Sequence, residues 1–545
     1  MDDPFGWSFG LAKAWPNTTV EASDSMAGFG LSIAREQERH ELRRAVTIWG
    51  SYAWGYADVG ADIYVALGLV VGAAMGAANI AFAFAGIVYV CIGLAYTELA
   101  SAYPVAGGGQ FFVTRALGDF MGFIAGWAVV LDFTIDISLF AWISIGYLSV
   151  LIPWLSAHHG WYFAAVLAMT AFLTTINVMG VKHSSRINEV VAALDVVNET
   201  LILVCGFVFA WDPMMLVHNM QSHWPTTGNL LLGISLAIIS FVGLESISQA
   251  AEETYRPSSV MPRTSMALIL TILLFALSFS NLVLGMPDVH TAAGATPMFS
   301  FLGNAQNNDK AVAVLATYIP YLGWLFKLYV PLLGALLIMI SSNSGVYGAS
   351  RIAYSMGNFN LLPSVFKRTN AKTKTPVFSI LFFAGVALVE LVAAFLQGDQ
   401  ALNFLADLYA FGAALSYTLV FVALIVLRFS DSAAPRPYKM PWSLPMTVNG
   451  VKGSLSVVSV VGLLGIGSIL VFTLLTHPIG RIAGPAWVVC GALFYVLYRR
   501  RNRQQVFKSL PRDWTEHHEQ VLARAGELEM LDQYRLATLR AGKTT

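Results

Sequence analysis

The sequence predicts an all-α polytopic membrane protein with twelve transmembrane helices. Of its 545 residues, 56% are hydrophobic and only 12% are charged, and the mean hydropathy is +0.64. Soluble domains carry about 25% charged residues. The 32 basic and 32 acidic residues cancel, so the chain has no basic field that would hold nucleic acid. This composition argues against a soluble enzyme, a disordered scaffold and a nucleic-acid-binding protein.

Twelve apolar stretches are long enough to cross a bilayer, whose hydrocarbon core of about 30 Å requires about 20 residues per helix. They cover residues 46–74, 77–102, 118–151, 160–180, 188–211, 228–254, 264–286, 325–357, 376–397, 400–427, 453–476 and 482–499. Helices are favoured over barrel strands because runs such as 332–340 do not alternate polar and apolar residues. The first stretch is too long for a signal peptide and lacks a small-residue cleavage site.

The basic residues of the loops predict the orientation. With the N-terminus inside, the outer side has only Lys310, Lys327 and Arg481, and the lysines and arginines of the other loops are cytoplasmic. Both termini are therefore expected in the cytoplasm, which requires an even number of crossings. We expect a multi-pass protein of the plasma membrane with a cytosolic extension over 1–45 and a cytosolic tail over 500–545. An amphipathic helix is predicted over residues 514–539 of that tail.

Two predicted spans, the first and the sixth, combine glycine with acidic residues at membrane depth. These residues are Asp58, Gly60, Ala61 and Asp62 in the first span, and Phe241, Gly243 and Glu245 in the sixth. An acidic residue at the bilayer centre costs about 2.5–3.5 kcal/mol on insertion scales, so we expect a cavity lined by protein. Paired interrupted helices in corresponding halves of a chain are typical of the binding site of an inverted-repeat transporter.

Several motifs carry a resemblance to a known family. They are the segment ELASAYPVAGG at 98–108, FVGLE at 241–245 followed by AEE at 251–253, GASR at 348–351 followed by LLP at 361–363, and RPY at 436–438. The chain thereby resembles the amino acid–polyamine–organocation permease superfamily, whose members have the leucine-transporter fold. The resemblance implies a 5+5 inverted repeat with discontinuous helices 1 and 6, plus two extra helices. The repeats would be residues 46–212 and 228–428, and the extra helices would lie in 453–499.

Seven carboxyl residues are predicted at membrane depth, six of them in pairs spaced by four residues, which share one face of a continuous helix. They are Asp58 and Asp62, Asp132 and Asp136, Asp195 and Glu199, and Glu245. Adjacent like charges in a low dielectric cannot all ionise, so protons or a cation are expected among them. We expect substrate contacts from Asp58, Gly60, Ala61, Asp62, Asp132, Phe241, Gly243 and Glu245. We expect Asp195, Glu199, Ser341 and Ser342 to bind a proton or coupling cation.

The sequence departs from the superfamily pattern at two positions. Relatives usually carry a run of small residues in the broken first helix, whose bare N–H groups bind the substrate carboxylate. Asp62 stands beside that position here and would repel a carboxylate, which disfavours a plain zwitterionic amino acid. Proton-coupled relatives often have a lysine in the fifth helix, where this chain has Asp195. A carboxyl group there can carry a proton or coordinate a cation, but it cannot replace a fixed ammonium charge.

The predicted function is a secondary active transporter that moves an amino acid, polyamine or related amine by alternating access, coupled to protons or another cation. One alternative is a potassium importer of the same superfamily, suggested by Asp58, Asp132 and Glu245. Another is a non-transporting sensor with a permease fold. The expected partners are a small-molecule substrate, a coupling cation and the lipid bilayer.

No catalytic motif points to an enzyme, since we find neither a phosphate loop nor a nucleophile motif nor a metal-hydrolase motif. We expect no cofactor and no resident metal. The outer-loop histidines His158, His159, His218 and His223 suit no metal spacing. The three cysteines lie in separate apolar runs and predict no disulfide framework.

Overall fold

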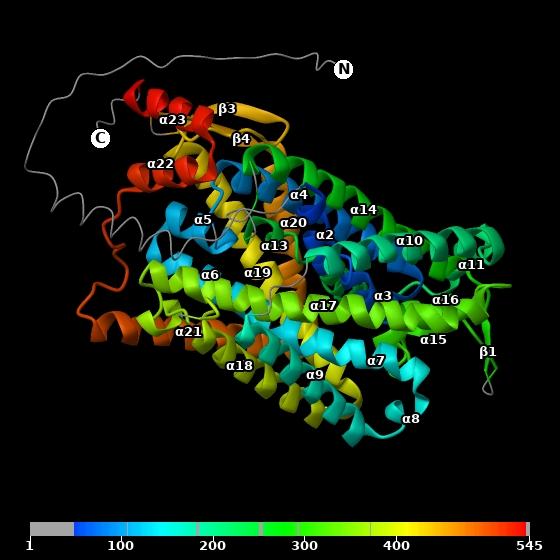
Figure 1. Ribbon diagram of the computed structural model, residues 1–545. Helices are drawn as coiled ribbons and strands as arrows, with labels where there is room; N and C mark the ends of the chain where they lie inside the picture. Colours follow the sequence, from blue (N-terminus) through cyan, green and yellow to red (C-terminus); the bar gives the residue numbers. More distant parts are fainter. Residues whose placement is uncertain are drawn as a thin grey trace, which may run out of the picture. The chain divides into compact units, whose positions relative to one another are not determined.

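Long apolar helices make up most of the described chain (Figure 1). The computed structural model describes residues 48–105, 107–180, 185–249, 254, 256–291, 294–370, 372–448 and 450–540. All of them belong to one structural unit, Arg44–Thr545. The predicted extension 1–45 and the 251–253 motif lie outside the described residues.

Eleven segments of the described chain are long and apolar enough to cross a membrane. They are Ile48–Ala102, Asp119–Leu151, His159–Met179, Ile187–Phe209, Thr227–Ser248, Pro257–Gly285, Gly323–Asn358, Val377–Leu396, Gly398–Ser430, Val457–Thr476 and Gly480–Arg501. The first has 55 residues, more than twice the roughly 20 that one crossing needs. It contains both of the first two predicted spans. The count of twelve crossings and the repeat topology stay predictions.

The first half of the chain provides ten α-helices and two other helical turns among its described residues. They are α2 (Ile48–Val59), α3 (Asp62–Ala74), η1 (Met75–Ala77), α4 (Ala78–Ala102), α5 (Gly108–Leu117), α6 (Asp119–Ile135), η2 (Asp136–Phe140), α7 (Ala141–Leu151), α8 (Pro153–Ser156), α9 (His159–Met179), α10 (Ser185–Phe209) and α11 (Pro213–Ser222). The η2 turn is π-helical and begins at Asp136. Such single wide turns inside α-helices often occur at functional sites.

The second half of the described chain continues in the same way. Its helices are α12 (Thr227–Ala237), η3 (Ile238–Phe241), α13 (Glu245–Gln249), α14 (Pro257–Gly285), α15 (Met298–Gly303), η5 (Asn308–Lys310), α16 (Ala311–Thr317), α17 (Gly323–Asn358), η6 (Ser364–Lys367), α18 (Val377–Leu396), η7 (Gly398–Gln400), α19 (Ala401–Ser430), α20 (Val457–Thr476), α21 (Gly480–Arg501), α22 (Trp514–Ala525) and α23 (Leu528–Arg540). The proline-initiated α14 follows the rule that Pro fits the first helical turn, where its missing N–H is not needed.

Three sequence-based expectations require correction. The all-α prediction missed two antiparallel hairpins, β1 (Val289–Thr291) with β2 (Gly294–Thr296) and β3 (Ser443–Val448) with β4 (Val451–Ser456). The predicted span 453–476 was too long at its start, because its first residues belong to β4. The single tail helix was wrong, because Gly526 adopts φ +71° and separates α22 from α23. A left-handed glycine is a common way to end a helix.

The α6–η2–α7 segment is the centre of the bundle. In its most apolar stretch 94% of the residues are buried, whereas only 22% of the residues are buried in the most apolar stretch of α21. Helices α17 and α19 pack against α6, and α14 packs against α4. The peripheral helices expose rows of aliphatic side chains, as expected of surfaces that face lipid tails.

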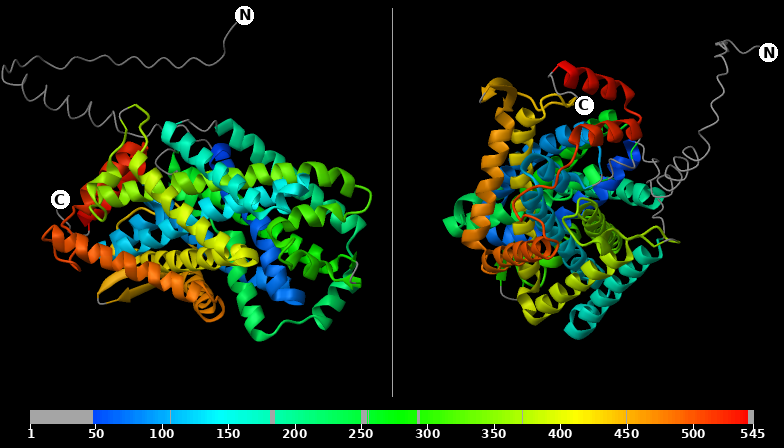
Figure 2. Two further views of the ribbon diagram at one scale, coloured as in Figure 1. Left: turned by 90° about the horizontal axis from the view of Figure 1, so that it is seen from below. Right: turned by 90° about the vertical axis from the view of Figure 1, so that its left-hand side faces the viewer.

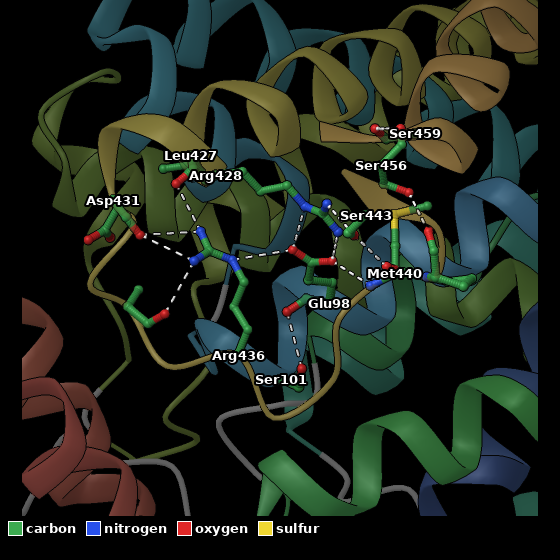
Figure 3. A network of polar contacts seen from close by, with 12 residues as sticks. Glu98, Ser101, Leu427, Arg428, Asp431, Arg436, Met440, Ser443, Ser456 and Ser459 are labelled. Atoms are coloured by element: carbon green, nitrogen blue, oxygen red, sulfur yellow. Dashed lines mark hydrogen bonds and ion pairs between the residues drawn. The ribbon is translucent and has the colours of Figure 1, made fainter. Parts of the chain in front are cut away.

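A buried ion-pair network fixes one end of α4 to the chain that follows α19 (Figure 3). The Glu98 carboxylate is fully buried and accepts from Arg428 Nε at 2.8 Å and from the Met440 N–H at 2.8 Å. Arg428 Nη2 pairs with the same carboxylate, and Arg436 Nε lies 3.3 Å from it. Arg428 Nη1 also donates to Ser443 Oγ, at the start of β3, at 2.9 Å. These bonds attach the base of the β3–β4 hairpin to the bundle.

The C-terminal segment packs against the same end of the bundle (Figures 1 and 2). The His517 ring stacks on Phe111 of α5, with 5.6 Å between ring centroids, and the His518 ring contacts Tyr103 at 5.2 Å. Burial and the nearby Arg115 lower the pKa of His517 to about 4 and that of His518 to about 3. Both rings are therefore neutral at pH 7. We call the bundle end that carries α5, α22 and α23 the C-terminal end.

Candidate functional site

The first predicted span is interrupted. Gly60 and Ala61 separate α2 from α3. The Gly60 N–H donates to the Tyr56 carbonyl at 2.7 Å, whereas the Tyr64 N–H donates only three residues back, to the Ala61 carbonyl, at 3.2 Å. A Cβ at Gly60 would come within 2.9 Å of the Tyr56 ring. The break is short, and the ring packed over it requires glycine.

The sixth predicted span is interrupted more widely. η3 ends at Phe241, and α13 begins at Glu245. Between them the backbone of Val242 is extended, and Gly243 adopts φ +99°, a backbone conformation that residues with a Cβ atom rarely adopt. A Cβ at Gly243 would lie 3.0 Å from Asp58 Oδ2. The two interrupted helices therefore meet at their breaks, with α13 packed on α2 and η3 packed on α3.

Five carboxyl side chains gather around this meeting point, and we call them the central carboxyl group. They are Asp58, Asp62, Asp132, Asp136 and Glu245, each at most 4% exposed. Asp62 interacts electrostatically with all four of the others. The carboxyls of Asp132 and Glu245 are in hydrogen-bonding contact with each other. Three elements distant in sequence, α2–α3, α6–η2 and α13, thus contribute to one cluster.

Few protein groups neutralise the central carboxyl group. Tyr417 donates its hydroxyl to Glu245 Oε2 at 2.6 Å, and Ser341 donates to Asp58 Oδ1 at 3.3 Å. Both oxygens of Asp62 are buried without a hydrogen-bond partner among the described residues. No ion pair to any of the five carboxyls is present in the described part of the chain. Buried charges without partners are costly, so the cluster requires protons or a bound cation.

A second buried group joins α10 to the first interrupted helix. Asp195 accepts from the Tyr64 hydroxyl at 2.6 Å and from the Tyr56 hydroxyl at 2.9 Å. Tyr56 also reaches Glu199 Oε2 at 3.1 Å, and Asn198 donates to the Tyr64 oxygen at 3.1 Å. Asp195 and Glu199 are fully buried. Because Tyr56 precedes the break and Tyr64 follows it, Asp195 holds both half-helices at once.

The remaining predicted site residues lie as follows. Ser341 contacts Asp58 and so lies at the central carboxyl group. Ser342 donates to the Ile137 carbonyl at 3.1 Å and forms a contact between helices. Phe241 is stacked on Tyr89 of α4, with 4.9 Å between centroids and 25° between planes. Ala61 is buried at the break.

The sequence-based interpretation missed several polar residues near these groups. Tyr417 binds Glu245, and Tyr409 is in hydrogen-bonding contact with Asp136. Glu390 of α18 accepts from Thr134 at 2.8 Å and from Ser138 at 3.1 Å. A carboxyl inside an apolar span was the signal that selected the other seven acidic residues, and Glu390 shows the same signal. The two tyrosines had no such signal in a chain with 20 tyrosines.

A further polar contact ties α12 to α19 away from the breaks. His477 Nδ1 lies 2.7 Å from Asp407 Oδ1, and the other ring nitrogen lies 2.7 Å from Ser235 Oγ. The Asp407 carboxylate also accepts from the Ile479 N–H at 3.2 Å. His477 is fully buried. These contacts give both ring nitrogens of His477 a partner and satisfy the Ile479 N–H just before α21. The sequence did not predict them.

The chemistry available at the breaks is the binding of positive charge. No group of three or more His, Cys, Asp or Glu in the described residues has a geometry that would hold a metal ion. Carboxyls spread over several helix turns instead suit an extended cation, whose ammonium groups can each donate to several oxygens.

Comparison with known proteins identifies the family. The model of the amino acid permease family matches residues 47–497. The chain is 25% identical over 467 residues to the branched-chain amino acid permease BcaP of Bacillus subtilis (strain 168), covering 82% of this chain and 90% of that protein. It is 24% identical to the low-affinity putrescine importer PlaP of Escherichia coli (strain K12), covering 72% and 83% of the two chains.

A eukaryotic relative adds to this pattern. The vacuolar cationic amino acid transporter 4 of Arabidopsis thaliana is 26% identical over 416 residues, which are 72% of this chain and 64% of that protein. These relatives are transporters, so the prediction that the chain is not an enzyme is confirmed. Together with the apolar helices, they also confirm the predicted superfamily and a multi-pass membrane protein. The chain belongs to the amino acid permease family.

Proposed function

We propose that the protein is a secondary transporter that carries a positively charged amine, either a cationic amino acid or a polyamine, across the membrane by alternating access. The observation that carries the proposal is the central carboxyl group, which is buried at the two helix breaks and has no basic partner in the described chain. A cationic substrate supplies the charge that the protein lacks. The named substrates of the putrescine importer and the cationic amino acid transporter support this choice of substrate class.

Asp62 disfavours a plain zwitterionic amino acid as the substrate. Its carboxylate follows the break directly, where an incoming carboxylate would meet a like charge. Repulsion between like charges at close range in a buried site costs several kcal/mol. The additional ammonium or guanidinium group of a polyamine or a cationic amino acid, placed there instead of a carboxylate, gains attraction to Asp62 and to the four carboxyls around it. A substrate with a net positive charge therefore fits the site better than a neutral one.

Coupling is proposed at Asp195 and Glu199. Protonation of Asp195, or a cation bound there, would weaken the hydrogen bonds that it accepts from Tyr56 and Tyr64. These two tyrosines flank the first break, so the change would alter how firmly α10 holds both half-helices. A ligand shifts a conformational equilibrium only when it binds the two states with different affinity. Rearrangement of this contact between the outward-open and inward-open states would supply that difference.

The remaining features of the proposal concern topology. Twelve crossings, a 5+5 repeat and cytoplasmic termini in the plasma membrane follow from the loop charges and from the superfamily resemblance. The two interrupted helices that meet at the central carboxyl group support the repeat, because half-helices facing a central site are the usual device of such transporters.

The proposal is tested with purified protein in proteoliposomes. Radiolabelled putrescine, arginine and leucine are offered under an imposed pH gradient, and rubidium serves as a tracer for potassium. We expect putrescine or arginine to accumulate and leucine and rubidium to be excluded. Rubidium accumulation without amine uptake would favour the potassium importer instead. Amine binding without flux into sealed vesicles would favour a sensor.

Coupling is tested in the same assay with Asp195→Asn. This variant should exchange internal for external amine but fail to accumulate it against the gradient. Glu189→Gln on the same helix is the matched control, because Glu189 is half-exposed and belongs to neither carboxyl group. Accumulation by Asp195→Asn at the wild-type level would exclude Asp195 as the coupling residue.

A further inference from the structure

The β3–β4 hairpin is an amphipathic element with an open apolar face. Its antiparallel register pairs Leu444 with Leu455, Met446 with Gly453 and Val448 with Val451. Side chains of directly opposed residues share one face of a two-stranded sheet. The alternate pairs place Ser443, Ser456, Pro445, Ser454, Thr447 and Lys452 on the other face. One face is therefore aliphatic and the other polar.

Most of the aliphatic face is not covered by the rest of the described chain. Leu444 is 57% exposed, Val451 is 46% exposed, and Met446 and Val448 are similar. Trp442, directly before β3, is 75% exposed. On the β4 side the bundle covers the middle of this face, where a Cβ at Gly453, the partner of Met446, would lie 2.4 Å from the Phe429 ring. A contiguous apolar patch of this kind indicates a binding surface rather than scattered exposure.

The hairpin is held rigidly at its base. Arg428 donates to Ser443 at the first residue of β3, and Ser456, the last residue of β4, donates to the Pro441 carbonyl at 2.9 Å. Arg428 is in turn paired with the buried Glu98 (Figure 3). The open face is thus presented in a fixed position by a buried ion-pair network and is not a loosely attached loop.

The position of the hairpin points to its partner. Figures 1 and 2 place it at the C-terminal end of the bundle and at the rim. Strand β4 ends at Ser456, and the candidate membrane span α20 begins at the next residue. The exposed side chains of α20 near this junction are Val457, Val461 and Leu464. The aliphatic face of the hairpin therefore continues an apolar surface that faces lipid.

We propose that the β3–β4 hairpin lies in the bilayer interface at the C-terminal end of the bundle, with Leu444, Met446, Val448 and Val451 among the upper acyl chains. Trp442 then lies at headgroup level, where tryptophan is enriched. Lys452, on the polar face, faces the headgroups and water, where anionic lipids attract it. The partner is thus the lipid surface itself, and the inference depends only on the protein being a membrane protein.

Site-directed spin labelling tests this placement in nanodiscs of phosphatidylcholine and phosphatidylglycerol at 3:1. Single cysteines are introduced at Met446 and at its sequence neighbour Thr447, which lies on the polar face. The background is Cys490→Ser, because Cys490 is exposed whereas Cys91 and Cys205 are buried. Leu464→Cys on α20 provides the lipid reference, and the exposed Glu529→Cys on α23 provides the water reference. Accessibility to oxygen and to a water-soluble nickel chelate is measured for each label.

The expected result is that the label at 446 matches the lipid reference and the label at 447 matches the water reference. Equal access of the nickel chelate to both labels would overturn the proposal. Protection of label 446 from both reagents would also overturn it, because a second copy or another protein would then cover the face. A label at Val448 repeats the test if Met446→Cys does not elute as a monodisperse species.

Discussion

The carboxylate of Asp58 lies against the backbone of Gly243, 3.0 Å from where a Cβ would stand. The two residues lie on different interrupted helices. A side chain at position 243 would occupy the space into which the Asp58 carboxylate fits. The contact ties the geometry of the sixth span directly to the charge in the first span.

Gly243→Ala should therefore abolish most transport. Alanine at φ +99° is strained by about 1–2 kcal/mol, and its methyl group would displace Asp58. We expect the initial rate of amine uptake to fall about tenfold or more, because each 1.4 kcal/mol is a factor of ten. Gly385→Ala is the control, because a Cβ at Gly385 meets nothing within 4 Å. Normal uptake by Gly243→Ala would show that the contact has no role in transport.

Asp62→Asn should weaken binding while stabilising the empty protein. Both Asp62 oxygens are buried without partners, and the amide removes a negative charge from among four other carboxyls. A charge buried without a partner is costly, so its removal should raise the melting temperature without substrate. The increase in melting temperature caused by saturating amine should shrink. Asp399→Asn, at an exposed position, should change neither value.

Glu98→Gln should destabilise the protein strongly. It leaves the buried Arg428 without its carboxylate, and breaking one partner of a buried pair costs about 3–5 kcal/mol. We expect a clear loss of apparent melting temperature in detergent. Glu519→Gln removes the carboxylate from an exposed pair with Arg535 and should cost less than about 1 kcal/mol. Equal effects of the two substitutions would argue against a structural role for the Glu98 network.

Docking of α22 should weaken in acid. The pKa values of His517 and His518 are lowered to about 4 and about 3 in the docked state, from about 6.5 when free. The undocked state therefore binds more protons below pH 6.5, and docking loses free energy as the pH falls from 6.5 towards 4. At pH 5 the loss is about 2 kcal/mol for each histidine.

Hydrogen–deuterium exchange checks this prediction. Amides of α22 should exchange faster at pH 5 than at pH 7.5 after correction for intrinsic rates. The charged groups facing the two rings are Arg115, Arg512, Arg524, Arg436 and Asp431. Because most of them are positive, protonated rings would be repelled. His518→Phe should keep the ring packing on Tyr103 and reduce the effect of acid by about half, since each histidine contributes a similar amount. Equal protection of α22 at both pH values would contradict the expectation.

The sequence predicted the membrane class, ten of the span positions to within a few residues and both interruptions, because these depend on local composition. Apolar runs of about 20 residues and glycine beside aspartate leave a clear signal. The start of α14 was missed because residues 257–263 are polar. The β3–β4 hairpin was missed although its sequence carries a signal, since Leu444, Met446 and Val448 alternate with other residues just before the Asn-Gly pair at 449–450.

Side-chain partnerships were predicted less well. The sequence predicted Ser341 as a ligand of a coupling cation but did not identify its protein partner, which tertiary packing makes Asp58. The spacing of Asp195 and Glu199 indicated a shared helix face, yet it contained no sign that Tyr56 and Tyr64 would bind them from another helix. Such contacts are set by how helices pack, and a single sequence does not report that.

Asp119, at the start of α6, binds the C-terminal segment, and this contact limits where the chain can be shortened or tagged. Its carboxylate accepts from Arg499 at 2.8 Å and from the Leu510 N–H at 3.0 Å, and it also pairs with Arg512. A gene truncated after codon 501 would strip two of these donors from a buried aspartate and uncover the Phe111 and Tyr103 rings. Affinity tags are therefore better appended beyond residue 540 than substituted for the last forty residues.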